Sequence, residues 1–312
     1  MPDDLRPRSM ADMPVQIPSN PASAAAARAR FFNTGNAFMI VAPPVPDHSF
    51  TAEPARALDP ATPTGFIACD LSTELGAAHP ATAPFLLARY ARIRAGETLD
   101  ARFVASGAIH YVIAGNGRTD CAGETVAWSA GDVFILPGGA AHRHSAGSDD
   151  AVLWLVTNEP FLALDNTQAP AEGNAPTRVV HYPAAEIARQ MALIYAAGEV
   201  DSGRAVMFSS EDQAHNRNIL PTLTLAMNSL PAGQTQRPHR HNSVAVSLVI
   251  AGEGCYSLVD GRRKDWSPYA TTVTPPTSVH SHINAGPDRA MFLIVQDGGL
   301  YHHARAMGFS FD

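Results

Sequence analysis

The sequence predicts an all-β protein made of two similar halves, and three observations support this prediction. The 312 residues include 25 Pro and 23 Gly, and only 16% are charged, a composition typical of turn-rich β folds. Short apolar runs broken by turn signals fill residues 84–165 and return over residues 204–297, as expected for antiparallel sandwiches or barrels. The two stretches also share their order of features, which indicates a duplicated domain.

The duplication is visible in two segments of the chain. "HYVIAGNGRTDCAGETVAWSAGDVFILPGGAAHRH" and "SLVIAGEGCYSLVDGRRKDWSPYATTVTPPTSVHSH" both contain a strand, an Ala-Gly-x-Gly turn, a hairpin, a strand, a proline loop and a His-x-His. The repeat is about 140 residues long, which is the size of a domain and too long for a solenoid unit. We therefore expect two barrels of the same topology.

The chain divides into four expected segments. Residues 1–60, rich in Pro and Ala, predict an extended arm that is either frayed or packed on a partner subunit. Residues 61–166 form the first β domain, residues 167–200 a linker with a helix, and residues 201–312 the second β domain. The stretch "YHHARAMGF" near the end of the sequence predicts an exposed tail or edge.

One helix is expected after Pro183. Ile187, Met191 and Ile194 recur at i, i+4 and i+7, and Tyr195 follows at i+8, so one face of the helix is apolar. Gly198 is the expected stop. These side chains are interpreted as core residues of the linker helix.

Charge and cysteine usage exclude several classes of function. The net charge is −7 and no basic cluster occurs, which argues against nucleic acid and anionic membrane surfaces as partners. No stretch approaches the roughly 20 apolar residues of a membrane span. The three cysteines are far apart and in no CxxC spacing, and no apolar run follows "MPDDLRPRSM". These features predict a reduced, cytoplasmic protein without a signal peptide.

Two histidines in the second half point to a metal. His239 and His241 are one residue apart, directly before a β-branched apolar run. Residues i and i+2 of an extended chain share a face, so both imidazoles point to one side. This is the arrangement that a metal ion needs.

The surrounding residues resemble the motifs of the cupin family. Gly233, the His239–His241 pair and Gly252 correspond to its first motif, and "PPTSVHSH" with His280 corresponds to its second. The resemblance covers residues 84–300 and implies two jelly-roll barrels (double-stranded β-helices). It also implies that His239, His241 and His280 bind the metal. Many cupins have a Glu as fourth ligand, but Ala245 occupies that position here.

Within the cupins, "PHRH" followed by "PPTSVHSH" looks most like gentisate 1,2-dioxygenases and their salicylate and 1-hydroxy-2-naphthoate relatives. The resemblance implies an Fe(II)-dependent, extradiol-type ring-cleaving dioxygenase. Its substrates would be dioxygen and a hydroxylated aromatic acid, which chelates the iron through its carboxylate and adjacent hydroxyl. Family members of this kind also imply a homo-oligomer, either a dimer or a tetramer.

The same resemblance assigns the remaining site residues. His282 corresponds to a histidine that contacts substrate or oxygen, Asn228 to a polar residue that faces the pocket, and Arg204 to an arginine that meets the substrate carboxylate. Ser247 occupies a substrate-binding position where relatives carry a second arginine, so one carboxylate anchor is missing. Typical gentisate dioxygenases also hold their metal in the first repeat, whereas the motif histidines here lie in the second.

The first repeat is expected to bind no metal. Its two ligand positions fall at Arg102 and Val104, and the carboxylate position falls at Ala108, which leaves His142 alone at a ligand position. His110 and His144 are nearby in sequence but occupy no ligand position of the motif. We consider them only as a substitute pair.

Two other functions stay open on the sequence alone. One is a different metallo-cupin, such as a diketone-cleaving oxygenase, or an isomerase or hydrolase that uses another divalent metal. The other is a non-catalytic cupin that binds a small aromatic ligand. Ser247 weakens the dioxygenase interpretation, and the histidine set weakens the binding-protein interpretation.

Overall fold

The computed structural model describes residues 9–198 and 204–312 of the chain. By its internal contacts the chain divides into two units, residues 1–43 and residues 44–312. The described part of the arm begins at Ser9. The expected absence of a signal peptide and the expected domain boundary between residues 200 and 201 both involve residues outside the described ranges.

The first unit is an extended arm. It contains one short helix, α1 (Ala24–Ala27), whose N-cap residue Ser23 accepts a hydrogen bond from the Ala26 N–H. A single bridge joins Gln16 to Phe31. Several large apolar side chains of this unit are exposed: Phe31, Phe32, Phe38, Met39, Ile40 and Val41.

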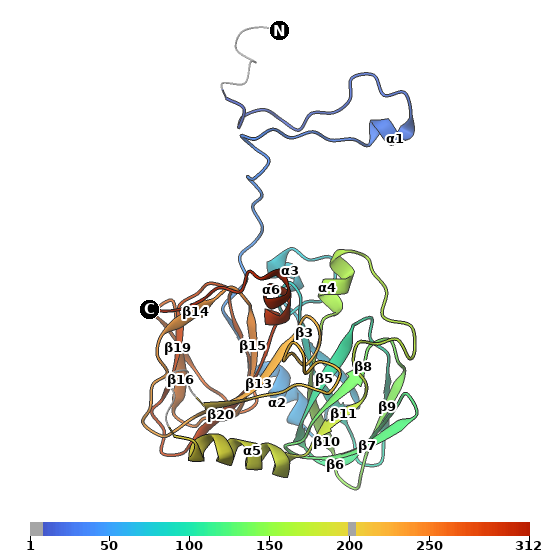
Figure 1. Cartoon of the computed structure of the whole chain (residues 1–312). Helices are drawn as coiled ribbons and strands as arrows, with labels where there is room; N and C mark the ends of the chain where they lie inside the picture. Colours follow the sequence, from blue (N-terminus) through green and yellow to red (C-terminus); the bar gives the residue numbers. More distant parts are fainter. Residues whose placement is uncertain (1–8, 199–203) are drawn as a thin grey trace. The chain divides into compact units, whose positions relative to one another are not determined.

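The second unit holds two barrels side by side, drawn in green and orange in Figure 1. The first barrel has a six-stranded sheet of order β11-β8-β5-β10-β3-β2 and a four-stranded sheet of order β4-β9-β6-β7. Its strands are β2 (Gly65–Cys69), β3 (Leu87–Ile93), β4 (Thr98–Ala101), β5 (Gly107–Ala114), β6 (Asn116–Cys121), β7 (Glu124–Ser129), β8 (Val133–Pro137), β9 (His142–Ala146), β10 (Ala151–Thr157) and β11 (Val180–Tyr182).

The second barrel repeats this plan. Its larger sheet has the order β1-β18-β15-β20-β13-β12 and its smaller one the order β17-β16-β19-β14-β21. The strands are β1 (His48–Phe50), β12 (Arg204–Met207), β13 (Thr224–Leu230), β14 (His239–His241), β15 (Ala245–Ala251), β16 (Cys255–Val259), β17 (Arg262–Asp265), β18 (Thr271–Thr274), β19 (His280–Asn284), β20 (Ala290–Gln296) and β21 (Phe309–Phe311). The expected all-β fold with two jelly-roll barrels is confirmed.

The helices are short and lie outside the sheets. They are α2 (Ala52–Leu58), α3 (Ser72–Leu75), α4 (Glu159–Leu164), α5 (Ala184–Ala196) and α6 (Gly298–Ala304). The linker helix α5 begins directly after Pro183 and buries Ile187 and Met191, which confirms the periodicity in the sequence. It runs below the barrels in the view of Figure 1.

The segment borders differ from the expected ones in two places. Strand β1 pairs with β18 of the second barrel and buries Phe50, so the arm ends well before residue 60. Strand β11, within the expected linker, adds an edge to the first barrel by pairing with β8. Composition favoured an arm and a linker there, but three-residue strands at sheet edges leave almost no pattern in a sequence.

The larger sheets of the two barrels pack against each other. Their shared apolar core contains Tyr90 and Trp154 from the first barrel and Val246 and Leu293 from the second. Thr271 of the second barrel accepts a hydrogen bond from the Trp154 Nε1–H at 2.9 Å and bonds the Tyr90 hydroxyl at 2.7 Å. The two barrels are thus joined by a dry core with satisfied polar groups.

The interiors of the two barrels differ. The first is filled by an apolar cluster that includes Phe103, Trp128, Phe134 and Leu153. The corresponding cluster of the second barrel contains only Leu230, Cys255 and Ala290, with Trp266 packed against it. The second barrel therefore has room for a cavity where the first is packed.

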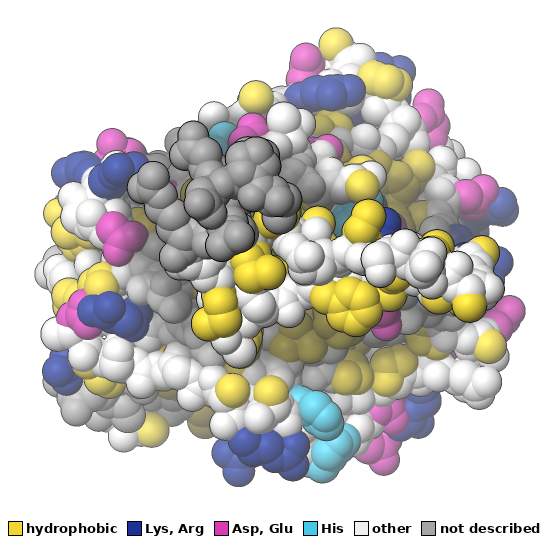
Figure 2. Space-filling view, turned by 90° about the horizontal axis from the view of Figure 1, so that it is seen from above, with side chains coloured by type: hydrophobic (Ala, Val, Ile, Leu, Met, Phe, Trp, Pro, Cys, Tyr) yellow, Lys and Arg dark blue, Asp and Glu magenta, His cyan; other side chains and the backbone are white. Residues whose placement is uncertain are grey.

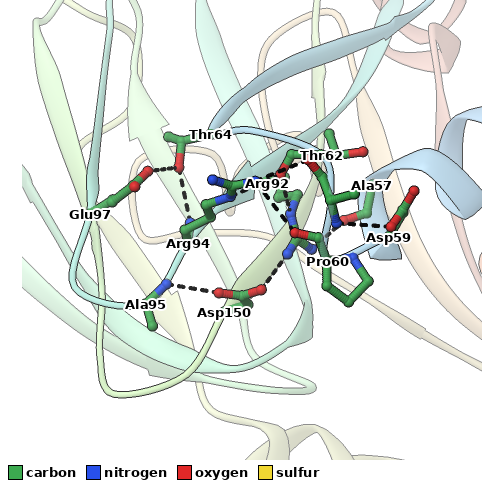
Figure 3. Close-up of polar contacts among 11 residues, drawn as sticks. Ala57, Asp59, Pro60, Thr62, Thr64, Arg92, Arg94, Ala95, Glu97 and Asp150 are labelled. Atoms are coloured by element: carbon green, nitrogen blue, oxygen red, sulfur yellow. Dashed lines mark hydrogen bonds and ion pairs between the residues drawn. The ribbon is translucent and has the colours of Figure 1, made fainter.

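A buried arginine fixes the segment that crosses from one barrel to the other (Figure 3). Arg92 is 2% exposed, donates to the carbonyls of Ala57 and Thr62 at 2.9 Å and pairs with Asp150. Asp150 also accepts the N–H of Ala95 at 2.9 Å. This network holds the chain between α2 and β2 against the first barrel.

The surface is mixed in charge. On the face shown in Figure 2, Lys and Arg are interspersed with Asp and Glu, and the residues described there form no broad basic patch. The three cysteines, Cys69, Cys121 and Cys255, are buried and unpaired. Among the described residues, no helix has the length and apolar character needed to cross a membrane.

Candidate metal centre

Strands β14 and β19 bring three histidines together at the mouth of the second barrel. His239 and His241 are buried on one side of β14, while Arg240 between them is exposed. His280, the first residue of β19, pairs directly with His239 across the sheet. One ligand nitrogen from each of these three residues lies within 4.8 Å of the others. The structure therefore assembles the three histidines that the sequence singled out.

Backbone carbonyls orient all three rings. The Nδ1 atoms lie 3.0 Å from the Arg237 carbonyl for His239, 2.8 Å from the Ser243 carbonyl for His241, and 2.9 Å from the Ser278 carbonyl for His280. A carbonyl only accepts, so each Nδ1 carries the proton and each Nε2 presents a free lone pair. Outer partners of this kind are a regular feature of histidine metal ligands. The residues therefore fit a metal ion.

Burial also keeps the three rings neutral. It lowers the pKa of His239 and of His241, and it lowers the pKa of His280 to about 4. Neutral imidazoles are the form that binds a metal, since the protonated ring has no free lone pair. No preceding deprotonation at neutral pH is needed for these ligands.

The three histidines line a cavity of about 490 Å³ inside the second barrel. Asn228, Ser247 and His282 line the same cavity, as the resemblance implied. Ala245, at the position of the absent fourth ligand, is also on its wall. A small side chain there leaves space beside the three imidazoles instead of a carboxylate.

His282 is held by a short chain of hydrogen bonds. Its Nδ1 lies 2.8 Å from the Ser257 hydroxyl, which accepts a hydrogen bond from the Trp266 Nε1–H at 2.8 Å. The ring also packs edge-on against Trp266 and Phe292. Desolvation by burial lowers the pKa of His282 well below its ordinary value. The ring is therefore fixed and neutral, and it faces the cavity.

Arg204 lies in a smaller cavity of about 110 Å³ that adjoins the first. Its guanidinium sits over the ring of Tyr195 at 4.2 Å. Asn228, Gln236 and His282 line both cavities and thus connect them. The side chains of Asn228, Gln236 and His282 therefore lie between Arg204 and the histidine triad.

Several residues on the cavity wall were not singled out by the sequence. The Gln296 Nε2 lies 3.1 Å from the His241 Nε2, and the Gln236 Oε1 is buried without a hydrogen-bond partner among the described residues. Phe309 of β21 also lines the cavity. Strand β21 pairs with β14, but the stretch "YHHARAMGF", expected to be a tail or edge, reaches this strand only with Phe309, and its first four residues belong to helix α6.

A larger hollow of about 920 Å³ leads to the cavity. The two share Met207, Thr224 and His302 on their walls. The other charged or titratable side chains that line the hollow are Arg217, Arg305, His215 and His303. No signal in the sequence could have placed these residues together, since they come from two distant loops and α6.

The first barrel gathers three histidines as well. His110 of β5 and His142 and His144 of β9 are buried, and their ligand nitrogens lie within 4.8 Å of one another. The expectation of a metal-free repeat counted His142 alone, since no other histidine stands at a motif position, but the fold brings His110 and His144 next to it. The pairing registers give the reason: His110 stands at the position of Ser247, and His144 at that of His282.

Comparisons with known proteins agree with this architecture. The cupin domain family matches residues 96–158 and 227–296. The salicylate 1,2-dioxygenase of Pseudaminobacter salicylatoxidans superposes with a TM-score of 0.73 over 88% of this chain and 91% of that one, at 15% identity. The similarity extends over both barrels and shows the fold.

Two curated relatives match by sequence. A 5-aminosalicylate 1,2-dioxygenase from Comamonas sp. is 37% identical over 81 residues, and a gentisate 1,2-dioxygenase from Ralstonia sp. is 33% identical over 82 residues. Each match covers 26% of this chain, and it spans 22% and 23% of the respective relative. The matched segment is thus about a quarter of each protein's length.

Proposed function

We propose that this chain, a bicupin related to the gentisate and salicylate 1,2-dioxygenases, opens the ring of an aromatic acid that bears a hydroxyl ortho to its carboxylate. The observation that carries the proposal is the histidine triad, with three carbonyl-oriented rings on a 490 Å³ cavity. The curated relatives named for 5-aminosalicylate and gentisate support the substrate class.

Fe(II) is the metal we propose for His239, His241 and His280. Imidazole nitrogens suit iron, and three neutral ligands leave several coordination positions open. Iron bound there would allow electrons to pass between the aromatic ring and dioxygen. The chain itself supplies the ligands, their orientation and a cavity for the substrate.

The hollow in front of the cavity favours an anionic substrate. Its walls carry Arg217 and Arg305 together with three histidines, and no Asp or Glu occurs among its lining residues. A hollow lined by positively charged arginines raises the local concentration of anions. Arg204 in the adjoining small cavity adds a further positive charge near the metal cavity.

Within the cavity, fixed polar groups orient the ring. Asn228 and Gln236 lie between the metal cavity and Arg204, and the Gln236 Oε1 has no hydrogen-bond partner among the described residues. A substrate hydroxyl or ring substituent can satisfy this acceptor. Ser247, in place of an arginine, leaves room on the opposite wall.

His282 is the proposed catalytic histidine. Ser257 and Trp266 fix its ring, and its neutral state at pH 7 allows it to accept a proton or donate a hydrogen bond at Nε2. Holding the substrate hydroxyl as its proton leaves is the role that this geometry favours. The buried surroundings strengthen that interaction and exclude water.

The bond to be cleaved lies between the carboxyl- and hydroxyl-bearing carbons. Because such a substrate needs only one ring hydroxyl, the reaction is better described as 1,2-cleavage than by the expected extradiol label, which refers to a diol. The names of the curated relatives carry the same 1,2 designation.

The proposal is tested by oxygen uptake with the iron-loaded protein. Gentisate, salicylate, 5-aminosalicylate and a hydroxynaphthoate are the substrates, with benzoate and a β-diketone as controls. We expect uptake with at least one ortho-hydroxy acid and a ring-opened product by mass spectrometry. Uptake with the diketone alone would favour the other metallo-cupin reaction, and tight binding without turnover would favour a binding protein.

We also propose a cytoplasmic homo-oligomer, either a dimer or a tetramer. The exposed apolar side chains of the arm support an arm that packs on a partner subunit, since exposed apolar segments of this kind mark interaction sites. Light scattering on the full chain and on a variant without residues 1–43 tests this. An unchanged mass would contradict a role of the arm in assembly.

A further inference from the structure

The histidine cluster of the first barrel has the features of a ligand set. His110, His142 and His144 come from two strands of different sheets, and their ring centroids are 5.0–6.1 Å apart. One nitrogen of each ring lies within 4.8 Å of the other two. Imidazole–metal bonds of about 2.1 Å require only a small further approach of the three rings.

The ring nitrogens of this cluster lack hydrogen-bond partners. Both nitrogens of His110 and the Nε2 atoms of His142 and His144 are buried with no partner among the described residues. A neutral imidazole has one donor and one acceptor, and leaving them unpaired in a protein interior costs free energy. One nitrogen from each ring, three of these four, can bind a single ion, and unpaired buried nitrogens in this arrangement call for a ligand.

An outer partner already orients one of the rings. The His144 Nδ1 lies 2.7 Å from the Thr119 hydroxyl, and this hydroxyl accepts a hydrogen bond from the Trp128 Nε1–H at 2.9 Å. With the proton on Nδ1, the Nε2 lone pair of His144 points to the other two rings. His110 is held in place by stacking on Phe134 at 4.5 Å.

We propose that His110, His142 and His144 form a second metal site, which binds a divalent transition-metal ion such as Zn²⁺. Its ligands differ from those of the second barrel, because only His142 stands at the position of a motif ligand, that of His280. The inference does not depend on the proposed dioxygenase reaction.

The second metal has a structural role. Apolar side chains of the first barrel, among them Phe103, Trp128 and Phe134, pack around the cluster. Three histidines leave the fourth position of the ion to a water molecule, and the packed apolar surroundings favour a structural role over a reaction. An open groove that includes Arg102, Arg143 and His142 on its walls reaches the cluster and provides a path for the ion.

The test measures metal content in the full chain. A His239→Ala/His280→Ala variant removes the second barrel's triad and leaves the core of the first barrel untouched. After chelator treatment and exchange against Zn²⁺, elemental analysis is expected to give about two ions per wild-type chain and about one per variant chain. Zn²⁺ should also raise the melting temperature of this variant by about 5 °C or more.

A third variant assigns the remaining ion. Adding His110→Leu, which fills the space of the ring with an apolar side chain, should reduce the zinc content to near zero and remove the Zn²⁺-dependent rise in melting temperature. If the His239→Ala/His280→Ala variant bound no zinc, the proposal would be overturned. An ion that persists after His110→Leu would also overturn it, since that ion would belong to surface histidines. If the third variant failed to fold, the zinc content of the second would still decide.

Discussion

The two barrels have the same frame and different interiors. Their strands pair in matching registers, so that Thr119 and His144 of the first barrel correspond to Ser257 and His282 of the second. Yet the first barrel is filled with apolar side chains, while the second surrounds a cavity of about 490 Å³. The comparison teaches that one backbone design supports either a packed core or a cavity lined by histidines.

The difference begins at the mouth of each barrel. In the second, β14 carries two inward-facing histidines and pairs with β19. In the first, the pairing registers put Ala101 and the buried Phe103 at the equivalent positions, and not Arg102 and Val104 as expected from the sequence, because Ala101 pairs with His142 as His239 pairs with His280. The first barrel gathers its histidines one layer deeper, through His110 on β5.

The largest expected effect concerns the triad of the second barrel. His280→Ala should lower oxygen uptake by about 10³-fold or more, since loss of a ligand removes several kcal/mol of metal-dependent stabilisation. His239→Ala and His241→Ala should do the same. Oxygen electrode assays and iron analysis measure the loss.

Arg102→Ala is the control, because Arg102 is an exposed arginine of the first barrel next to the equivalents of the motif ligands. It should retain iron and activity. Full iron and activity in His280→Ala would refute the assignment of the catalytic triad and remove the main functional difference between the barrels.

The next effect concerns Asp297, which stands in the second barrel where the first barrel has Asn158. Asp297 accepts the Val244 N–H at 2.9 Å, as Asn158 accepts the Ser106 N–H at 2.8 Å in the first barrel. Burial raises the pKa of Asp297 from 3.8 to about 7, and Tyr301 is its titratable neighbour. Between these pH values the folded state holds a proton that the unfolded state has released, so stability falls as the pH rises.

Asp297→Asn gives the second barrel the residue of the first and abolishes this titration. The free energy of unfolding of the variant relative to the wild type should therefore increase by about 4 kcal/mol from pH 4 to pH 8. Urea unfolding at several pH values measures the difference. A difference that is constant over this range would show that the carboxyl is not titrating there.

A third prediction concerns the crossing segment between the barrels. Arg92→Ala should lower the free energy of unfolding by about 3 kcal/mol, because it removes a buried guanidinium that pairs with Asp150 and donates to the carbonyls of Ala57 and Thr62. Arg143→Ala, which breaks the exposed pair with Asp100, is the control and should have little effect. Equal losses in the two variants would contradict the role given to the buried network.

The smallest effect distinguishes Ser257 of the second barrel from Thr119 of the first, whose hydroxyls each bond a histidine. Ser257→Ala should lower kcat by about 10- to 100-fold with little change in KM, since it frees the ring of His282. Thr119→Val, at the equivalent position, should act on stability instead and cost about 1 to 3 kcal/mol. Steady-state kinetics and urea unfolding of both variants measure this. A kcat loss of the same size in both would indicate that the barrels are coupled in catalysis.

The sequence predicted those parts of the fold and the site that leave local patterns. His239 and His241 share a strand face, the proline loop places His280, and the periodicity after Pro183 gives α5. The family resemblance placed Asn228 and His282 on the cavity wall. The histidine pair and helix α5 follow from spacing within a few residues, whereas Asn228 and His282 were assigned by the resemblance to the family.

What the sequence did not predict depends on long-range pairing. The cluster of His110 with His142 and His144 arises from two strands in different sheets, and no spacing within one motif reveals it. The short strands β1 and β11 pair far from their sequence neighbours. Arg217 and Arg305 meet at the hollow only because α6 folds back over the second barrel.

The apolar contact between the larger sheets has a consequence for the history of the duplication. A cavity lined by histidines gives the second barrel little dry interior of its own, and Leu230, Cys255 and Ala290 are too few to offset the entropy of folding it. The neighbouring repeat supplies the missing hydrophobic surface through Tyr90 and Trp154. Loss of the first copy would therefore destabilise the second barrel as well, and this dependence gives selection a reason to preserve both copies.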